Sequence, residues 1–145
     1  MKIRDILKLK EFRYRAVVTV SPNDFVSAAI RKLAEHDRGS LPVCNDKDEL
    51  VGIITERDIM RKCFARGDDF INKKIMDVMT KQVAIATPED DLDYAINTMK
   101  QKRIRHIPII DAKKVVGMLS MRDILGFQYA ETKAEIRYVH MLPRR

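Results

Sequence analysis

The sequence lacks tryptophan and long apolar runs, and it has only two cysteines, five glycines and five prolines. No apolar stretch reaches the roughly 20 residues that a membrane-spanning helix needs, so we expect no membrane segment. Charged residues interrupt the N-terminus from Lys2 onward, which leaves no uncharged signal-peptide core. We therefore expect a cytoplasmic protein.

The scarce cysteines and glycines also exclude several kinds of chemistry. Cys44 and Cys63 form neither a Cys-x-x-Cys pair nor a Cys/His cluster, so no zinc site is expected. Cys44 lies in an apolar run and is predicted to be a buried thiol. The sequence offers no glycine-rich phosphate loop and no nucleophile paired with a base. It therefore predicts neither an enzyme, nor a metal site, nor an obligatory cofactor.

The overall composition is that of a soluble globular protein. Hydrophobic residues make up 46% and charged residues 34% of the 145 positions, enough for one compact domain or two small ones that share a core. The net charge of +7 favours anionic partners, or reflects a solvated basic surface. Basic stretches at 102–105 and 144–145 leave nucleic-acid binding as an alternative function, although no helix-turn-helix pattern supports it.

The chain contains an internal repeat. Residues 51–59 and 116–124 each consist of an apolar run with a glycine, then a hydroxyl residue, then an aspartate three positions on. Pro42 and Pro108 are 66 positions apart but the two motifs only 65, so we place a one-residue deletion in the turn between them. The leaders 2–7 and 74–79 are also alike. Such self-similarity indicates a tandem duplication.

Each copy of the repeat predicts the same order of elements. A strand such as 17–20 ends at Ser21-Pro22, and an amphipathic helix follows. Strands 41–44 and 50–54 form a hairpin, as do 107–110 and 115–119, and helices begin after Thr55 and Ser120. The helical faces share a small alanine, from which we expect close packing of the two helices; these faces are Val26, Ala29, Ile30, Leu33 and Leu92, Ala95, Ile96, Met99.

These elements predict an α+β fold with two βαββα repeats about a pseudo-twofold axis and an additional C-terminal helix. We place the first repeat with its leader at 1–66, a linker at 67–80, the second repeat at 81–126 and a helical tail at 127–145. In the tail, Tyr129, Ile136 and Val139 lie roughly on one side of the expected helix, which ends at Pro143.

The hydroxyl-x-x-aspartate pairs have two interpretations. Thr55 with Asp58, and Ser120 with Asp123, match the helix-capping pattern in which the hydroxyl and the acid bind backbone N–H groups reciprocally. A helix start is also a ready site for an anion. Arg57 and Arg122 lie in the first turn, where the helix dipole disfavours a cation, and an anionic ligand relieves that cost.

The paired motifs resemble the cystathionine beta-synthase (CBS) domain pair, or Bateman module. The match rests on the runs 51–58 and 116–123, the proline-bearing strands 41–44 and 107–110, the Ser21-Pro22 and Thr87-Pro88 starts, and the 77–80 leader. The resemblance implies a regulatory module that binds AMP, ADP, ATP or an adenosyl relative such as NAD or S-adenosylmethionine in clefts between the repeats. It also implies a homodimer that signals to an unknown protein target.

The resemblance further implies roles for individual residues. Asp58 and Asp123 would hold ribose hydroxyls, and Thr55 and Ser120 would bind phosphate or ribose. Arg105 and His106 would meet the nucleotide held at Asp58, whereas Gly39 and Ser40 would face the one held at Asp123. The remaining candidates are Arg57 and Arg122 at the helix starts, and Ser21 and Thr87 at the strand ends. The Asp58 cleft, with more basic neighbours, should prefer the more highly charged ligand.

Two further predictions concern the surface. His36 and His140 have no special sequence context and are predicted to be plain surface residues. The helices after Thr55 and Ser120 carry more apolar residues than a small domain can bury, which favours a dimer through them. These residues are Ile59, Met60, Ile124, Leu125 and Phe127.

Overall fold

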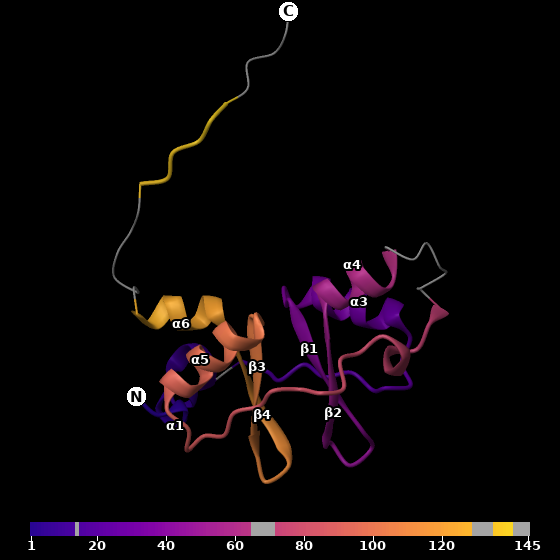
Figure 1. Ribbon diagram of the computed structural model, residues 1–145, viewed down its shortest axis with the longest axis horizontal. Coiled ribbons are helices and arrows are strands. Elements are labelled where there is room, and N and C mark those ends of the chain that lie inside the picture. Colours follow the sequence, from indigo (N-terminus) through magenta and orange to yellow (C-terminus); the bar gives the residue numbers. More distant parts are fainter. Residues whose placement is uncertain (14, 65–71, 129–134, 141–145) are drawn as a thin grey trace, which may run out of the picture.

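The computed structural model describes residues 1–13, 15–64, 72–128 and 135–140, and within these ranges it confirms an α+β chain of two similar halves (Figure 1). The first half contains α3 (Val26–Glu35), β1 (Ser40–Cys44), β2 (Leu50–Thr55) and α4 (Glu56–Lys62). The second contains α5 (Leu92–Lys102), β3 (His106–Asp111), β4 (Lys114–Ser120) and α6 (Met121–Gln128). Two short helices, α1 (Ile3–Leu7) and α2 (Lys10–Arg13), precede both halves in the sequence. The 3-10 helix η3 (Ile75–Asp77) follows the first half and precedes the second in the sequence.

Each half has one antiparallel hairpin, as predicted. Pro42 pairs with Ile53 in the first hairpin, and Pro108 pairs with Met118 in the second. Both hairpins carry a register shift at the same place, after Val43 and after Ile109. The first turn is longer than the second, so the one-residue difference between the repeats lies in the turn, where we placed it.

The first strand predicted for each repeat is reduced to a single bridge. Val20 pairs in parallel with Val43, and Ala86 pairs in the same way with Ile109. The Val20 N–H donates to the Pro42 carbonyl, 3.1 Å away, and the Val20 carbonyl accepts from Cys44 at 2.9 Å. Prolines 22 and 88 follow almost at once and have no N–H to donate, so neither pairing continues into a ladder.

Two hydrophobic clusters, one per half, form the core. Ala29 on α3 is fully buried in one cluster and Ala95 on α5 in the other. The small alanine side chain therefore lets each helix pack closely on its own hairpin. Our expectation that the alanines bring the two helices together was wrong. Cys44 is buried, as predicted, and Cys63 is buried as well.

The leaders are exchanged between the halves. Ile3 and Ile6 of α1 are fully buried in the cluster of the second half, whereas Ile75 and Val78 are buried in the cluster of the first. The Ile3 N–H donates to the Asp90 carbonyl at 2.9 Å, and equivalently Ile75 donates to Asp24 at 2.8 Å. Although we grouped residues 1–66 by sequence order, the N-terminal leader packs with the second repeat.

The described part of the C-terminal tail differs from the prediction at residues 135–140. Helix α6 ends at Gln128, and residues 135–140 form no helix. Ile136 and Val139 are exposed there, so they do not form a packed helical face. Tyr129 and Pro143 lie outside the described residues. Within the described ranges, no helix has the length and apolarity to cross a membrane.

Candidate ligand-binding site

Both hydroxyl-x-x-aspartate pairs form the reciprocal helix cap that the sequence predicts. At the start of α4, the Asp58 N–H donates to Thr55 Oγ1 at 3.0 Å, and the Thr55 N–H donates to Asp58 Oδ2 at 3.1 Å. At the start of α6, Ser120 and Asp123 exchange the same two bonds, each 3.0 Å long. The local role of the motif is therefore identical in the two halves.

Asp58 is closed in by protein groups. Its Oδ1 accepts the Thr80 hydroxyl at 3.1 Å and lies 3.2 Å from the Lys62 ammonium, four residues along α4. The residue is 9% exposed, and Lys62 is also anchored to the Val78 carbonyl at 2.9 Å. Both carboxylate oxygens thus have protein partners, one of which is Thr80, directly after the leader 74–79.

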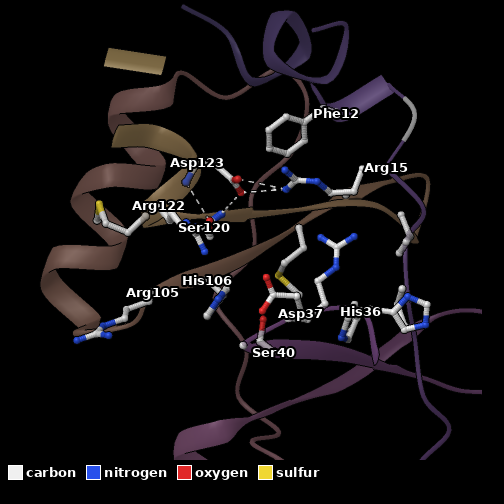
Figure 2. A pocket seen from close by; sticks show the side chains of 18 of the residues that line it. Phe12, Arg15, His36, Asp37, Ser40, Arg105, His106, Ser120, Arg122 and Asp123 are labelled. Carbon is white, nitrogen blue, oxygen red and sulfur yellow. Dashed lines mark hydrogen bonds and ion pairs between the residues drawn. The ribbon is translucent and has the colours of Figure 1, made fainter. Parts of the chain in front are cut away.

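Asp123 instead faces a cavity. Its side chain is 14% exposed and pairs with Arg15, whose Nη1 lies 3.2 Å from Oδ1 and 3.3 Å from Oδ2. Figure 2 shows Arg15 reaching Asp123 beside the ring of Phe12. The guanidinium carbon lies 4.4 Å from the centre of that ring, and Phe12 in turn contacts Phe127 of α6 at 5.6 Å.

The cavity lies between the two halves and has a volume of about 960 Å³. This is within the usual range of small-molecule sites. The segments 15–18 and 36–42 line one side, and residues 105–106 and 116–125 line the other. The wall is partly apolar, through Leu7, Pro42, Val17, Val18, Val116 and Met118, and partly basic, through Arg15, Arg38, Arg105 and Arg122.

The imidazole of His106 lies at the point where the halves meet. A Cβ atom on Gly39 would lie 3.0 Å from His106 Cε1, so glycine leaves the space that the ring occupies. Burial lowers the pKa of His106, and Arg105 lowers it further, while the charge of Asp123 acts in the opposite direction. His106 is thus held toward its neutral form, in which one ring nitrogen accepts a hydrogen bond.

Two buried polar atoms beside His106 have no hydrogen-bond partner within the described part of the chain. They are Ser40 Oγ, on a residue that is 4% exposed, and Arg38 Nε. Burial lowers the pKa of Arg38, and the positive charge of Arg15 is the next largest cause. Because buried polar groups are normally satisfied, these atoms indicate a site for a polar ligand or ordered water.

The cavity brings together seven of the twelve candidate residues: Gly39, Ser40, Arg105, His106, Ser120, Arg122 and Asp123. Gly39 and Ser40 lie with Asp123, as we expected. Arg105 and His106, which we assigned to a ligand at Asp58, also lie on the Asp123 cavity, and the basic charge lies there with them.

The other five candidates do not line this cavity. Thr55 and Asp58 form the closed cap of α4, and Arg57 donates to the Arg103 carbonyl at 3.1 Å. Ser21 and Thr87 each donate a backbone N–H to an aspartate three residues on, at 2.9 and 2.8 Å.

Sequence reasoning missed the ionisable lining residues Arg15, His36, Asp37, Arg38 and Glu56. Arg15, Asp37 and Arg38 carried no repeated motif, and His36 is exposed, as predicted, but also lines the cavity. The signal for Arg15 is the unequal spacing after the leaders: nine residues (8–16) precede Val17, but three (80–82) precede Val83. His140 is exposed, as predicted. Among the described residues no group of three His, Cys, Asp or Glu side chains is placed to hold a metal ion.

The chain is similar to known proteins over most of its length. A family model described as the CBS domain matches residues 3–65 and 75–129. The chain is 34% identical over 125 residues to inosine-5'-monophosphate dehydrogenase of Methanocaldococcus jannaschii, a match that covers 86% of this chain and 24% of the enzyme. It spans 24%, 59% and 58% of the lengths of three curated relatives that it matches.

Solved structures with CBS domains share the fold. One, from Burkholderia ambifaria MC40-6, has a TM-score of 0.84 and 33% identity, and the alignment covers 94% of this chain and all of the other. Another is a CBS domain pair in complex with 5'-methylthioadenosine and S-adenosyl-L-methionine, with a TM-score of 0.77 and 27% identity over 91% of this chain and 98% of the other.

Proposed function

Because the chain belongs to the CBS domain family, a family of regulatory modules, we propose that it binds an adenosyl ligand in the Asp123 cavity and signals its presence to a partner. The observation that carries the proposal is that one cavity combines the helix-capping carboxylate of Asp123, an apolar wall and basic side chains. A purine ring fits the apolar part, a ribose diol donates to Asp123, and phosphate or another polar group meets the basic part.

The solved neighbour with bound ligands supports the ligand class. That protein holds 5'-methylthioadenosine and S-adenosyl-L-methionine, which share an adenosyl group. Only the adenosyl class is carried over to this chain; the candidates remain AMP, ADP, ATP, NAD and S-adenosylmethionine. The ligand would act as a regulatory signal and would not be turned over.

The cavity suggests how binding becomes a signal. Its two sides come from different halves, so a ligand that contacts both changes their relative orientation by its differential affinity for the two arrangements. Arg15 and Phe12 also connect Asp123 to Phe127 on α6. Hydrogen exchange with and without ligand would locate the response, which we expect in α2 and α6.

We also propose that the module is a homodimer through α4 and α6. Ile59 and Ile124 are buried, so they do not provide the interface that we expected of them. Met60 and Leu125, at equivalent positions, are 58% and 50% exposed. Each helix thus has one large exposed apolar side chain that is available for a second copy of the chain, and Leu125 also lines the cavity.

Calorimetry with adenosine, AMP, ADP, ATP, NAD and S-adenosylmethionine tests ligand binding. Asp123→Asn removes the charge that the diol needs, and we expect about a tenfold or greater loss of affinity. Asp46→Asn is the matched control, because Asp46 is exposed in the β1–β2 turn and does not line the cavity. Absence of binding to every ligand, or equal binding by the two variants, would contradict the proposal.

A further inference from the structure

Arg15 enters the ligand cavity from a segment that the second repeat does not have. Residues 8–16 separate the leader from Val17, whereas only residues 80–82 occupy the equivalent interval before Val83. The longer segment contains α2 and ends at Arg15 and Ala16, both of which line the cavity. The wall contributed by Arg15 is therefore specific to the Asp123 side.

In the structure, Arg15 already occupies the carboxylate that a ribose diol would use. Its Nη1 lies within 3.3 Å of both oxygens of Asp123, and Oδ2 also accepts the Ser120 N–H. Figure 2 shows the Arg15 guanidinium directed at the Asp123 carboxylate. A diol that donates to Asp123 therefore competes with Arg15 and displaces at least part of this ion pair.

Displacing Arg15 has an electrostatic cost because the cavity is rich in cations. Arg38, Arg105 and Arg122 line the same space, and the carboxylates there are Asp37, Glu56 and Asp123. Arg15 already acts on Arg38, whose pKa it lowers. A guanidinium moved from Asp123 without another anion is left partly buried beside like charges, which is unfavourable.

We infer that Arg15 determines the charge specificity of the site: the cavity selects adenosyl ligands that carry phosphate over neutral or cationic ones. The ligand's diol takes Asp123, and its phosphate provides the anion for the displaced guanidinium. This inference rests on the proposed function. A neutral adenosyl ligand lacks that compensation, and the sulfonium of S-adenosylmethionine adds a further positive charge.

The test compares affinities for ADP, adenosine and S-adenosylmethionine in three variants. In the unchanged protein, ADP should bind at least about tenfold more tightly than adenosine or S-adenosylmethionine, since its phosphates accept charge-assisted bonds. Arg15→Gln should weaken ADP and leave adenosine equal or tighter, so that the ratio falls about tenfold. Arg15→Lys retains the charge and should keep most of the preference.

Arg31→Gln is the matched control, because Arg31 is exposed on α3, does not line the cavity, and its loss changes the net charge equally. It should leave the ratio unchanged. An unaltered ADP-to-adenosine ratio in Arg15→Gln would overturn the inference while leaving the proposed function standing. So would an unchanged protein that binds adenosine or S-adenosylmethionine as tightly as ADP. Binding of none of the three would instead remove the proposed function itself.

Discussion

The two halves use the same capping motif in opposite settings. Asp58 is enclosed by Lys62 and Thr80, and Asp123 lies on a cavity with Arg15 as its ion-pair partner. The equivalent of Lys62 is Phe127, so α6 has no cation four residues after Asp123. The α2 segment supplies one from outside the helix instead. The motif therefore caps a helix in both repeats. It is a candidate ligand site only in the second repeat, where its aspartate faces the cavity.

The leaders add to this difference. Met79 lies against Gly52, where a Cβ atom would come within 2.6 Å of its sulfur and 3.0 Å of the Thr80 carbonyl oxygen. In the second half, a Cβ on Gly117 would meet only side-chain tips, Leu7 at 3.1 Å and Ile109 at 3.5 Å. A backbone atom therefore lies close to the glycine of the first half, whereas the close neighbour of the glycine in the second half is a flexible side chain.

Replacing each aspartate by alanine should have the largest effect and should separate the two roles. Asp58→Ala removes a cap, the hydroxyl bond from Thr80 and the ion pair with Lys62, and we expect a loss of about 3 kcal/mol in the free energy of unfolding. Asp123→Ala should lose less stability, about 1–2 kcal/mol, because it removes a cap and the ion pair with Arg15 but no additional hydroxyl bond such as that from Thr80 to Asp58. Urea denaturation of both variants measures the difference.

Ligand affinity measured on the same proteins should show the reverse order, with binding lost in Asp123→Ala and kept in Asp58→Ala at a temperature where both are folded. If Asp58 instead holds a ribose, as the family resemblance implies, Asp58→Ala would weaken binding. Equal stability losses in the two variants would contradict the contrast that the structure shows.

The glycines should give the next largest contrast. Gly52→Ala forces Met79 and the Thr80 backbone to move, and we expect a loss of about 2 kcal/mol. Gly117→Ala requires only a small shift of Leu7, and we expect a loss below about 1 kcal/mol. Thermal unfolding of both variants measures this. A loss in Gly117→Ala that matched that of Gly52→Ala would show that the second half is packed as tightly as the first.

The repeat, the hairpins and both helix caps could be predicted because they depend on local patterns. Pro42 and Pro108 mark the starts of the paired strands, and Ser120-x-x-Asp123 marks a helix start wherever it lies in the fold. The exchanged leaders and the enclosure of Asp58 depend on contacts between distant segments, such as Thr80 with Asp58. Arg15 belongs to no motif. The sequence signal for its ion pair with Asp123 is limited to the extra length of the segment 8–16, which contains Arg15.

Ser40 and His106 occupy equivalent positions at the starts of β1 and β3, and only the histidine titrates near neutral pH. The pKa of His106 is lowered in the folded protein, mainly by burial, so the unfolded chain binds the proton more strongly. Neutral His106 therefore contributes its full stability above the unfolded pKa of about 6.5, and this contribution falls as the pH drops below that value.

The melting temperature of ligand-free protein at pH 8 and pH 5.5 measures this effect. The decrease between the two should be smaller in His106→Gln than in the unchanged protein. Ser40→Ala removes a hydroxyl that has no hydrogen-bond partner among the described residues, and it should leave the pH dependence as it is. An identical decrease in His106→Gln and the unchanged protein would mean that His106 does not contribute to it.

The smallest effect on folding is expected where the halves are most alike. Met60 and Leu125 are equivalent and exposed, so Met60→Glu and Leu125→Glu should each change the free energy of unfolding of a single chain by less than about 0.5 kcal/mol. If α4 and α6 form the proposed dimer, each charge is buried against the second copy without a partner, and association weakens.

Light scattering at tens of micromolar should give a dimer mass for the unchanged protein and a lower mass for both variants. Val139→Glu is the control, since Val139 is 96% exposed and lies outside these helices. A single-chain mass for the unchanged protein would refute the dimer, and a response to only one substitution would show that α4 and α6 contribute unequally.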